Sequence, residues 1–338
     1  MKEKNKGFTL VELLAVIVIL ALIALIATPI ILNVINDAKK QAAKDSAYGY
    51  MDAVEKYIVS SELEDKSIKD GTYSVEELNS MGVSVKGSTP DNGNIEIKNK
   101  EVKSYDIGID GYAVSNGEVD KVSTTKSFKN GTAVYYNPVS GEKCKSSEAV
   151  STTGKKSGCM KWYVFNDKEG NATVNVILDH NTTAGVAYNS TGSNSEMKEV
   201  KRKLEEDTKD WKNTARLITA NEIAKITGNT GWDASKGEQS RFFLDSNNQT
   251  QTASSTKKSK YDWLFDYTND CARFGCNTQD SSTDGYWTST PYMTSSYGSN
   301  SGYAWVVNYS GSLEDTNVDG SGRNYGIRPV ITISKSDV

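Results

Sequence analysis

An apolar run with a single charge constrains this chain more than any other feature. Residues 8–32 contain 25 positions, and Glu12 is the only charged side chain among them. As an α-helix that rises about 1.5 Å per residue, the run is long enough to cross a hydrocarbon core about 30 Å thick. Because Lys2, Lys4 and Lys6 precede it, the sequence predicts one membrane-spanning helix with a cytoplasmic N-terminus.

The position of Glu12 inside the run adds a second constraint. A carboxylate in lipid is costly unless it is paired, so Glu12 needs a specific partner. Its alternative position is the membrane edge, but a glutamate stem is short for reaching the headgroups. Pro29 removes one helix hydrogen bond and is expected to kink or loosen the segment. An ordinary cleaved secretory signal is disfavoured, because residues 33–40 continue the helical pattern without a small-residue cleavage site.

The N-terminal residues also carry a family resemblance. Residues 7–12, with the sequence GFTLVE, together with the apolar run and Pro29, resemble the N-terminus of type IV pilins and pseudopilins. The resemblance implies cleavage between Gly7 and Phe8 by a membrane-embedded prepilin peptidase, N-methylation of Phe8, and assembly with other pilin subunits. In a bundle of such helices the new amino group of Phe8 can reach Glu12 of a neighbouring subunit, where two groups that are each costly in an apolar setting stabilise one another. Gly7, Phe8, Glu12 and Pro29 are therefore the predicted processing and assembly residues.

The helix is expected to continue beyond the apolar run to about residue 58. Apolar residues recur there at helical spacing, and charged residues fill the other faces. The apolar stripe consists of Val34, Ile35, Ala38, Ala42, Tyr50, Met51, Val54, Tyr57 and Ile58. We expect this half to pack on a soluble domain, although the stripe fits any membrane-anchored domain equally well.

Residues 63–128 are predicted to form a small antiparallel sheet against this helix. The expected elements are a helix at 75–81, strands at 94–98, 101–109 and 111–115, and turns at 91–93, 110–111 and 116–117. Residues 123–130 are polar and are interpreted as a linker.

Four cysteines fall in two local pairs, Cys144 with Cys159 and Cys271 with Cys276. In a translocated chain an even number of cysteines at short separation indicates disulfides, and local pairing is favoured among the three possible connectivities. A zinc site is the alternative. It is disfavoured because the chain has no CxxC motif and His180 is distant in sequence from both pairs.

Composition argues against nucleic-acid binding and against catalysis. The formal net charge is −4 and no stretch dense in Lys and Arg follows the N-terminus, so direct nucleic-acid binding is not expected. The single histidine, His180, is expected in a turn after a strand at 173–178, without an acidic partner or a nucleophile motif such as G-x-S-x-G. We therefore expect no enzymatic activity and no cofactor.

The character of the chain changes at about residue 131, and all six tryptophans lie between Trp162 and Trp305. Four blocks, at 217–226, 285–292, 304–311 and 326–330, resemble in order those of bacterial Lcl-type C-terminal domains. That group is similar to C-type-lectin-like and formylglycine-generating-enzyme-like folds. The resemblance implies a loop-rich α+β domain that displays a variable binding surface for a carbohydrate or a surface protein. The enzymes of that group depend on cysteine chemistry, whereas these cysteines look structural.

An aromatic stripe lies within this region, where Tyr303, Trp305, Val307 and Tyr309 alternate onto one face of an expected strand. Such a stripe suits stacking on sugars, and filling of the core is its more ordinary alternative. The other expected elements are a strand at 326–333, helices at 196–211 and 220–226, a cap on the second helix formed by Thr219 and Glu222, and an exposed loop at 234–260.

One spacing suits a metal ion. Asp315, Asn317 and Asp319 fit the first half of a calcium loop of the EF-hand type, D-x-N-x-D-G. Gly326 stands where the bidentate glutamate of such a loop belongs. Calcium is therefore a candidate ligand, and an Asp/Gly-rich hairpin is the alternative.

Together these features predict an α+β protein with four parts. They are a leader at 1–7, a long helix at 8–62 with residues 8–32 in the membrane, a pilin-like sheet at 63–128 and a lectin-like domain at 129–338. We expect a subunit of a type IV pilus-like filament, a minor or specialised pilin whose head mediates surface recognition or adhesion. The alternatives are a pseudopilin of a type II secretion-like or DNA-uptake machine and a simple membrane-anchored lectin. The expected location is the cell membrane before assembly and the extracellular filament or cell surface after processing.

Overall fold

The computed structural model describes residues 10–64, 68–121, 127–149, 158–191, 196–245, 259–265, 283–292, 302–319 and 325–338. The predicted cleavage site at Gly7 and Phe8 and the predicted disulfide between Cys271 and Cys276 lie outside the described residues. Within them the fold is a mixed α+β arrangement of one long helix, short helices and three five-stranded sheets. The predicted fold class is confirmed at that level.

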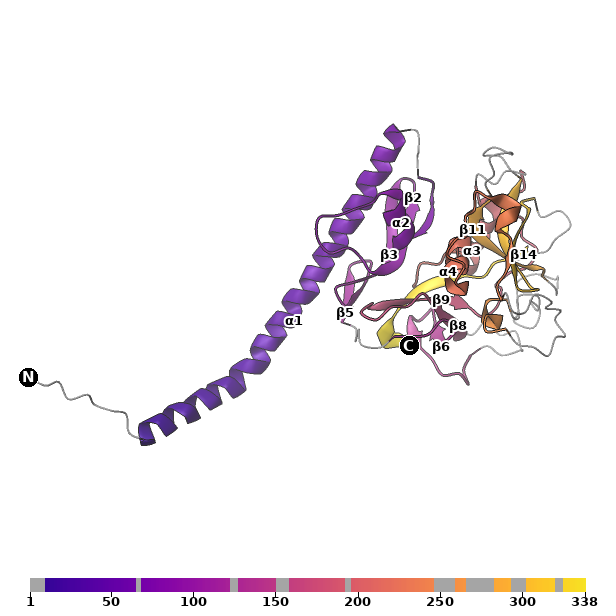
Figure 1. Ribbon diagram of the computed structural model, residues 1–338. Helices are drawn as coiled ribbons and strands as arrows, with labels where there is room; N and C mark the ends of the chain where they lie inside the picture. The colour runs from indigo at the N-terminus through magenta and orange to yellow at the C-terminus, as the bar shows by residue number, and fades with distance from the viewer. Residues whose placement is uncertain are drawn as a thin grey trace, which may run out of the picture.

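The first element, α1, is a helix of 54 residues from Leu10–Leu63 (Figure 1). Its first half projects away from the rest of the protein, and its second half lies along the first sheet. From Leu10 to Ile35, every described leucine, isoleucine and valine side chain is more than two-fifths exposed. The helix therefore carries an uncovered apolar half and a covered half.

The predicted membrane span over residues 8–32 is not confirmed. Among the described residues, no helix meets the combined requirement of length and apolar character for crossing a membrane.

The covered half of α1 begins at Ala43, later than the sequence predicted. Its buried residues are Ala43, Ala47, Tyr50, Met51, Val54 and Ile58, which follow helical spacing along one face. The small side chains of Ala43 and Ala47 let the helix approach the sheet closely, and Tyr50 donates a hydrogen bond to Asn79 Oδ1 at 2.7 Å. Val34, Ile35, Ala38 and Ala42, which we expected in this stripe, are instead exposed.

The first sheet follows α1 directly and is a simple antiparallel meander. Its strands are β1 (Gly71–Ser74), β2 (Asn92–Lys98), β3 (Glu101–Ile109), β4 (Tyr112–Ser115) and β5 (Glu118–Lys121), in that order, with helix α2 (Val75–Met81) between the first two. The predicted helix at 75–81 and strand at 101–109 are confirmed. Strand β5 escaped prediction, because Val119 is the one apolar residue in its four.

Local turn chemistry explains this meander. Three of its hairpins turn on pairs of residues with positive φ: Asn99 with Lys100, Asp110 with Gly111, and Asn116 with Gly117. Two consecutive positive φ values define the type I′ turn, whose twist matches that of the flanking strands. The turn predicted at 91–93 is wrong at its second and third positions, because β2 already begins at Asn92.

The remainder of the chain builds two further sheets. One has the order β15-β9-β8-β6-β7 and consists of β15 (Val330–Ser334), β9 (Thr173–Leu178), β8 (Met160–Phe165), β6 (Ala133–Asn137) and β7 (Glu142–Lys143). The other has the order β10-β13-β12-β11-β14 and consists of β10 (Phe242–Phe243), β13 (Ser312–Asn317), β12 (Tyr303–Asn308), β11 (Gly285–Pro291) and β14 (Tyr325–Gly326). The last strand, β15, pairs with β9, so the C-terminal end of the chain lies beside a strand from its middle.

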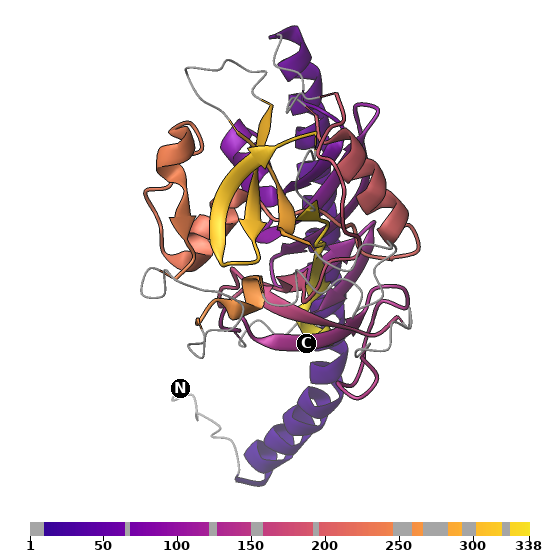
Figure 2. The ribbon, with the colours of Figure 1, turned by 90° about the vertical axis from the view of Figure 1, so that its right-hand side faces the viewer.

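In the described part of the chain, two helices and three short 3-10 helices accompany these sheets. They are α3 (Lys198–Thr208), α4 (Ala220–Thr227), η1 (Gly237–Ser240), η2 (Asp262–Leu264) and η5 (Lys335–Asp337). Helix α4 has the predicted capping box, since Thr219 accepts from the Glu222 amide and Glu222 accepts from the Thr219 amide. Figure 2, turned by 90°, shows α3 and α4 on opposite sides of the C-terminal strands.

The aromatic stripe largely fills the core. Trp305 and Val307 are fully buried, whereas Tyr303 and Tyr309 are each 40% exposed. Trp305 packs edge-on against Trp232 and beside Tyr292, with ring centroids 5.2 and 5.7 Å away. The core alternative is therefore confirmed for the centre of the stripe.

Arg328 is a buried connector in this half of the protein. Its side chain is fully buried and donates hydrogen bonds to the carbonyl oxygens of Leu178, Trp263 and Leu264. Its guanidinium also lies over the Tyr286 ring, 5.2 Å from the centroid. The predicted strand at 326–333 is interrupted at this point, because residues 327–329 turn the chain between β14 and β15.

The local disulfide between Cys144 and Cys159 is confirmed. It joins the segment after β7 to the start of β8 across 15 positions of sequence. Its loop includes residues 150–157, which lie outside the described residues.

Candidate functional site

The N-terminal half of α1 holds the predicted assembly residues that the structure describes. Glu12 lies in the first turn of α1 and is exposed among apolar side chains that are also exposed. Pro29 lies inside α1, which continues through it without interruption. A large apolar surface without a cover is typical of a site where another protein or a membrane binds. We call residues 10–35 the assembly segment.

The junction between the first sheet and the C-terminal half is the second notable region. Arg216, in the segment between α3 and α4, is 2% exposed and forms two hydrogen bonds with Glu222, at 2.7 and 2.6 Å. Its Nε donates to Asn94 Oδ1 on β2 at 2.7 Å. Burial lowers the pKa of the Arg216 guanidinium, but the charge and hydrogen bonds of Glu222 outweigh burial and raise it. Arg216 thus fastens the first sheet to the C-terminal half.

A carboxylate supports the same junction from the sheet side. Asp106 on β3 accepts hydrogen bonds from Ser115 Oγ at 2.5 Å and from the Thr214 amide at 2.8 Å. Burial raises the pKa of this carboxyl even though both donors favour its ionised form. The contacts with Thr214 place β3 against the segment that carries Arg216.

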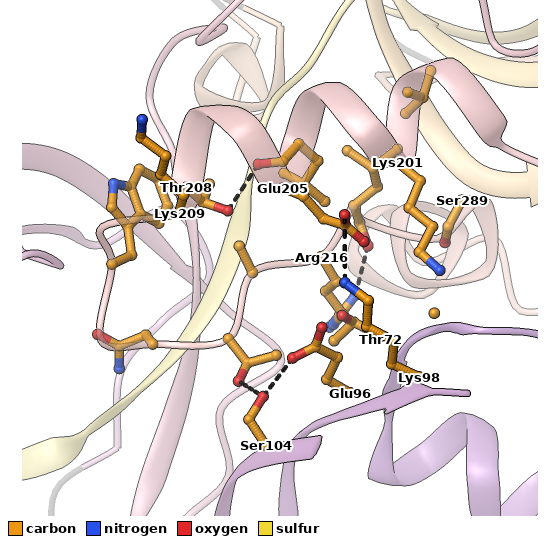
Figure 3. Close-up of a pocket in the computed structure, with 18 of the residues that line it drawn as sticks. Thr72, Glu96, Lys98, Ser104, Lys201, Glu205, Thr208, Lys209, Arg216 and Ser289 are labelled. Atoms are coloured by element: carbon orange, nitrogen blue, oxygen red, sulfur yellow. Dashed lines mark hydrogen bonds and ion pairs between the residues drawn. The ribbon is translucent and has the colours of Figure 1, made fainter. Parts of the chain in front are cut away.

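A cavity of about 360 Å³ opens beside this junction. Its walls come from β1, β2 and β3, from α3, from the segment 209–217 and from Ser289 on β11. Figure 3 shows Glu96 and Lys98 of β2 on one side of the cavity and Lys201 and Glu205 of α3 on the other. We call it the junction cavity.

The junction cavity combines lysines with an apolar floor. Lys98, Lys201, Lys209 and Lys212 line it, while its carboxylates are Glu96 and Glu205. Lys201, Lys209 and Lys212 form no ion pair within the described part of the chain, and Lys98 lies 3.9 Å from Glu205. The apolar lining comes from Met197, Val200, Leu204, Trp211, Ala215 and Leu217. Such a lining suits a small anionic ligand with an apolar face.

Sequence reasoning missed the junction cavity. Its lysines come from β2, α3 and the segment after α3, which are remote in sequence, so no motif unites them. One sequence feature could have indicated that α3 packs against another part of the protein. This helix is amphipathic, with Val200 and Leu204 buried and charged residues on its other faces.

His180 lies where the sequence predicted, just after β9, but its surroundings differ from the prediction. It is buried, and its Nδ1 is 2.5 Å from Asp179 Oδ1, so the expectation of no acidic partner is wrong. The acid is the preceding residue, so the pair is visible in the sequence itself.

The calcium candidates lie on and just after a strand. Asp315 and Asn317 belong to β13, and Asp319 follows it. The Asp315 carboxylate is engaged by Arg241, whose Nε and Nη2 lie 2.5 and 3.0 Å from its two oxygens. Within the described residues, no group of three or more His, Cys, Asp or Glu side chains is placed to hold a metal. Calcium binding stays a prediction.

A comparison with protein families identifies the N-terminus. A family model described as the prokaryotic N-terminal methylation motif matches residues 2–28. No curated protein and no solved structure matches the chain. The match gives the chain a type IV pilin-like N-terminus and indicates a type IV pilin or pseudopilin subunit, which assembles with other pilin subunits and is processed by a prepilin peptidase.

Proposed function

We propose that this protein is a structural subunit of a type IV pilus-like filament, in which the assembly segment packs against the same segment of other subunits. The observation that carries the proposal is the coincidence of the N-methylation motif with the uncovered apolar half of α1. The covered half of α1 carries the rest of the protein, which we call the head. When the first halves of several subunits pack together, their heads therefore lie around the outside of the bundle.

The driving force is burial of apolar surface. From Leu10 to Ile35 the exposed side chains include 16 leucines, isoleucines and valines, and burial contributes about 25 cal/mol per Å² of apolar area. Because they surround the helix instead of forming one stripe, several neighbours are needed to cover them. A helical bundle of like subunits supplies those neighbours.

Glu12 sets the axial register of this bundle. Cleavage after Gly7 gives Phe8 a free amino group four positions before Glu12. The amino group of one subunit and the Glu12 carboxylate of a neighbour meet only at one axial offset. A misplaced subunit leaves a carboxylate unpaired in an apolar setting, which is strongly unfavourable.

Glu12→Ala tests the assembly role. Filaments sheared from cells are purified and probed with an antibody against the head, and the membrane fraction is probed in parallel. We expect normal amounts of the variant in cells and little of it in filaments. Glu55→Ala, an exposed acid on the half of α1 that holds the head, is the matched control and is expected in filaments at wild-type level. Wild-type incorporation of Glu12→Ala would remove the register argument.

Processing separates this proposal from a simple anchored lectin. We expect the mature N-terminus at Phe8, with an N-methyl group, and an initial membrane location for the precursor. N-terminal sequencing of the surface protein tests the cleavage and the methylation, since an anchored lectin keeps residues 1–7, and fractionation of cells that lack the peptidase tests the location of the precursor. Deletion of the gene followed by assays of adhesion, protein secretion and DNA uptake separates a pilus subunit from a pseudopilin.

We further propose that the head serves surface recognition without enzymatic activity, and that the junction cavity binds an acidic sugar. Support comes from the lectin-like sequence blocks and from the lysines of the cavity. A carboxylate can pair with Lys98 or Lys201, while the apolar face of a sugar ring packs on the floor.

Galacturonate and galactose are suitable probes, because they differ only in the carboxylate. Titration calorimetry uses full-length protein in mild detergent. We expect weak binding of galacturonate that is lost at high salt, and no binding signal with galactose. Lys201→Gln should weaken binding about tenfold, the loss of roughly 1.4 kcal/mol. Lys225→Gln, which lies outside the cavity, is the control. Equal binding of both sugars, or none, would contradict the proposed ligand class.

A further inference from the structure

The end of the chain carries a buried lysine–aspartate contact that the assembly and recognition roles do not use. Lys335 follows β15 and Asp167 follows β8, and β9 lies between these two strands in the sheet. Lys335 Nζ is 2.8 Å from Asp167 Oδ1. The two side chains are 1% and 0% exposed.

This burial sets the pair apart. Lys225 and Glu76 are equally close, at 2.7 Å, but their side chains are 46% and 67% exposed. Among the lysine–carboxylate pairs of the described residues, only Lys335 and Asp167 are both shielded to this degree. Two charges removed from water in this way are costly unless their geometry is ideal.

The geometry of the contact is not that of a hydrogen-bonded ion pair. Asp167 Oδ2 accepts from the Phe128 amide at 2.8 Å, and Lys335 Nζ donates to the Lys168 carbonyl oxygen at 2.8 Å. Asp167 Oδ1, however, accepts no hydrogen bond within the described residues, although Nζ is in contact with it. The nitrogen therefore lies against the carboxyl group without alignment to an oxygen lone pair, and both groups are held in place by backbone contacts.

We propose that Lys335 and Asp167 condense into an intramolecular amide bond, which ties the C-terminal strand to the β8–β9 connection. A held amine at contact distance from a held carboxyl group has lost most of the entropy that opposes such a reaction in solution. The neutral amine is the nucleophile in such a reaction.

The reaction balances without an added reagent. One proton passes from Lys335 Nζ to the Asp167 carboxylate, which gives an amine and a carboxylic acid. The Nζ electron pair then forms a bond to Cγ of Asp167. A second proton moves from the nitrogen to the departing hydroxyl group, the C–O bond breaks, and one water leaves. No atom is oxidised or reduced.

Asp91 is our candidate for carrying the second proton. Asp91 and Asp167 line the same cavity, of about 420 Å³, into which the water can leave. Partial burial raises the pKa of the Asp91 carboxyl, and the charge of Asp110 raises it further, while Lys168 and Lys335 oppose them. Asp91 therefore holds a proton at a higher pH than an ordinary aspartate does, which suits a group that gives and takes protons.

Mass spectrometry of the full-length protein tests the bond directly. After reduction and alkylation of the cysteines, we expect the wild-type protein to be one water lighter than the mass calculated for its alkylated sequence. The tryptic digest should contain a branched peptide that joins the segment with Asp167 to the segment with Lys335. Lys225 and Glu76 should remain in linear peptides and serve as the internal control. A full sequence mass without the branched peptide would show a buried ion pair only and would overturn the proposal.

Variants test the chemistry independently of the fold. Lys335→Arg keeps the positive charge but removes the nucleophilic amine, so it should have its full mass. Asp167→Asn should still react but lose ammonia in place of water, a mass change that no ion pair produces. Asp91→Asn should lower the cross-linked fraction in freshly made protein without changing the unfolding temperature of the fraction that is not cross-linked. An Asp91→Asn protein that cross-links at the wild-type rate would remove Asp91 from the reaction.

Discussion

The guanidinium of Arg216 and the carboxylate of Glu222 form a bidentate ion pair at 2.7 and 2.6 Å, buried where the first sheet meets the C-terminal half. Glu222 also completes the capping box of α4, and Arg216 also reaches Asn94 on β2. One pair of side chains therefore fixes a helix start and connects two parts of the fold.

Removal of Arg216 should destabilise the protein strongly. Arg216→Ala leaves the Glu222 carboxylate buried without its partner, and breaking such a pair costs about 3–5 kcal/mol. Lys225→Ala breaks the exposed pair with Glu76 and should cost at most about 1 kcal/mol. Urea unfolding monitored by tryptophan fluorescence measures both. Similar small losses in the two variants would show that Arg216 does not hold the junction.

The attachment of the head to α1 should depend on the covered face of the helix. Ile58 is 1% exposed, and Ile58→Ala should lower the free energy of unfolding by about 2–5 kcal/mol through lost burial and a cavity. Its neighbour Val59 is 61% exposed, and Val59→Ala should change stability by less than about 0.5 kcal/mol. Thermal unfolding of the two variants, measured side by side, gives the comparison. Equal effects would show that the sheet does not cover the face of α1 that carries Ile58.

The disulfide between Cys144 and Cys159 should stabilise the head. A bond that closes a loop of this length contributes about 3 kcal/mol in the chain-entropy account. The double variant Cys144→Ser, Cys159→Ser is compared with wild type under non-reducing conditions. Cys271 and Cys276 then have the same redox conditions in both proteins. We expect a lower urea midpoint with an unchanged slope. An unchanged midpoint would mean that the loop is already ordered without the bond.

Glu77 should make stability depend on pH. Burial raises the pKa of its carboxyl, and Glu222 adds to the rise, while Arg216 and the hydrogen bonds from Ser74 oppose it. Since the folded protein then binds this proton more tightly than the unfolded chain does, the contribution of Glu77 is present at low pH. It is lost as the pH rises from the ordinary glutamate value of 4.5 through the raised value.

Glu77→Gln tests this pH dependence. Glutamine keeps the capping box and has no charge, so the variant should gain stability relative to wild type as the pH rises. Glu76→Gln, one position earlier and exposed, is the control and should keep the wild-type pH profile. Unfolding temperatures at a series of pH values give the comparison. Parallel profiles for Glu77→Gln and wild type would contradict the role of this half-buried charge.

Local patterns determined much of the fold. Helix α2 and strand β3 were predicted with the correct bounds, and so were the cap on α4 and the disulfide between Cys144 and Cys159. Each depends on residues that are near in sequence: a capping threonine with a glutamate three positions on, an alternating pattern, or two cysteines at short separation. The processing motif is local as well, and the family comparison recovers it over residues 2–28.

The tertiary structure alone decided what surrounds these elements. It showed that α1 is covered from Ala43 onward, that Trp305 lies in the core, and that Arg216 meets Asn94 across 122 positions. It also formed the junction cavity and brought Lys335 to Asp167. These contacts join residues that are remote in sequence and leave no periodic trace, because their energy comes from burial and from charge pairing that exist only once the chain has folded.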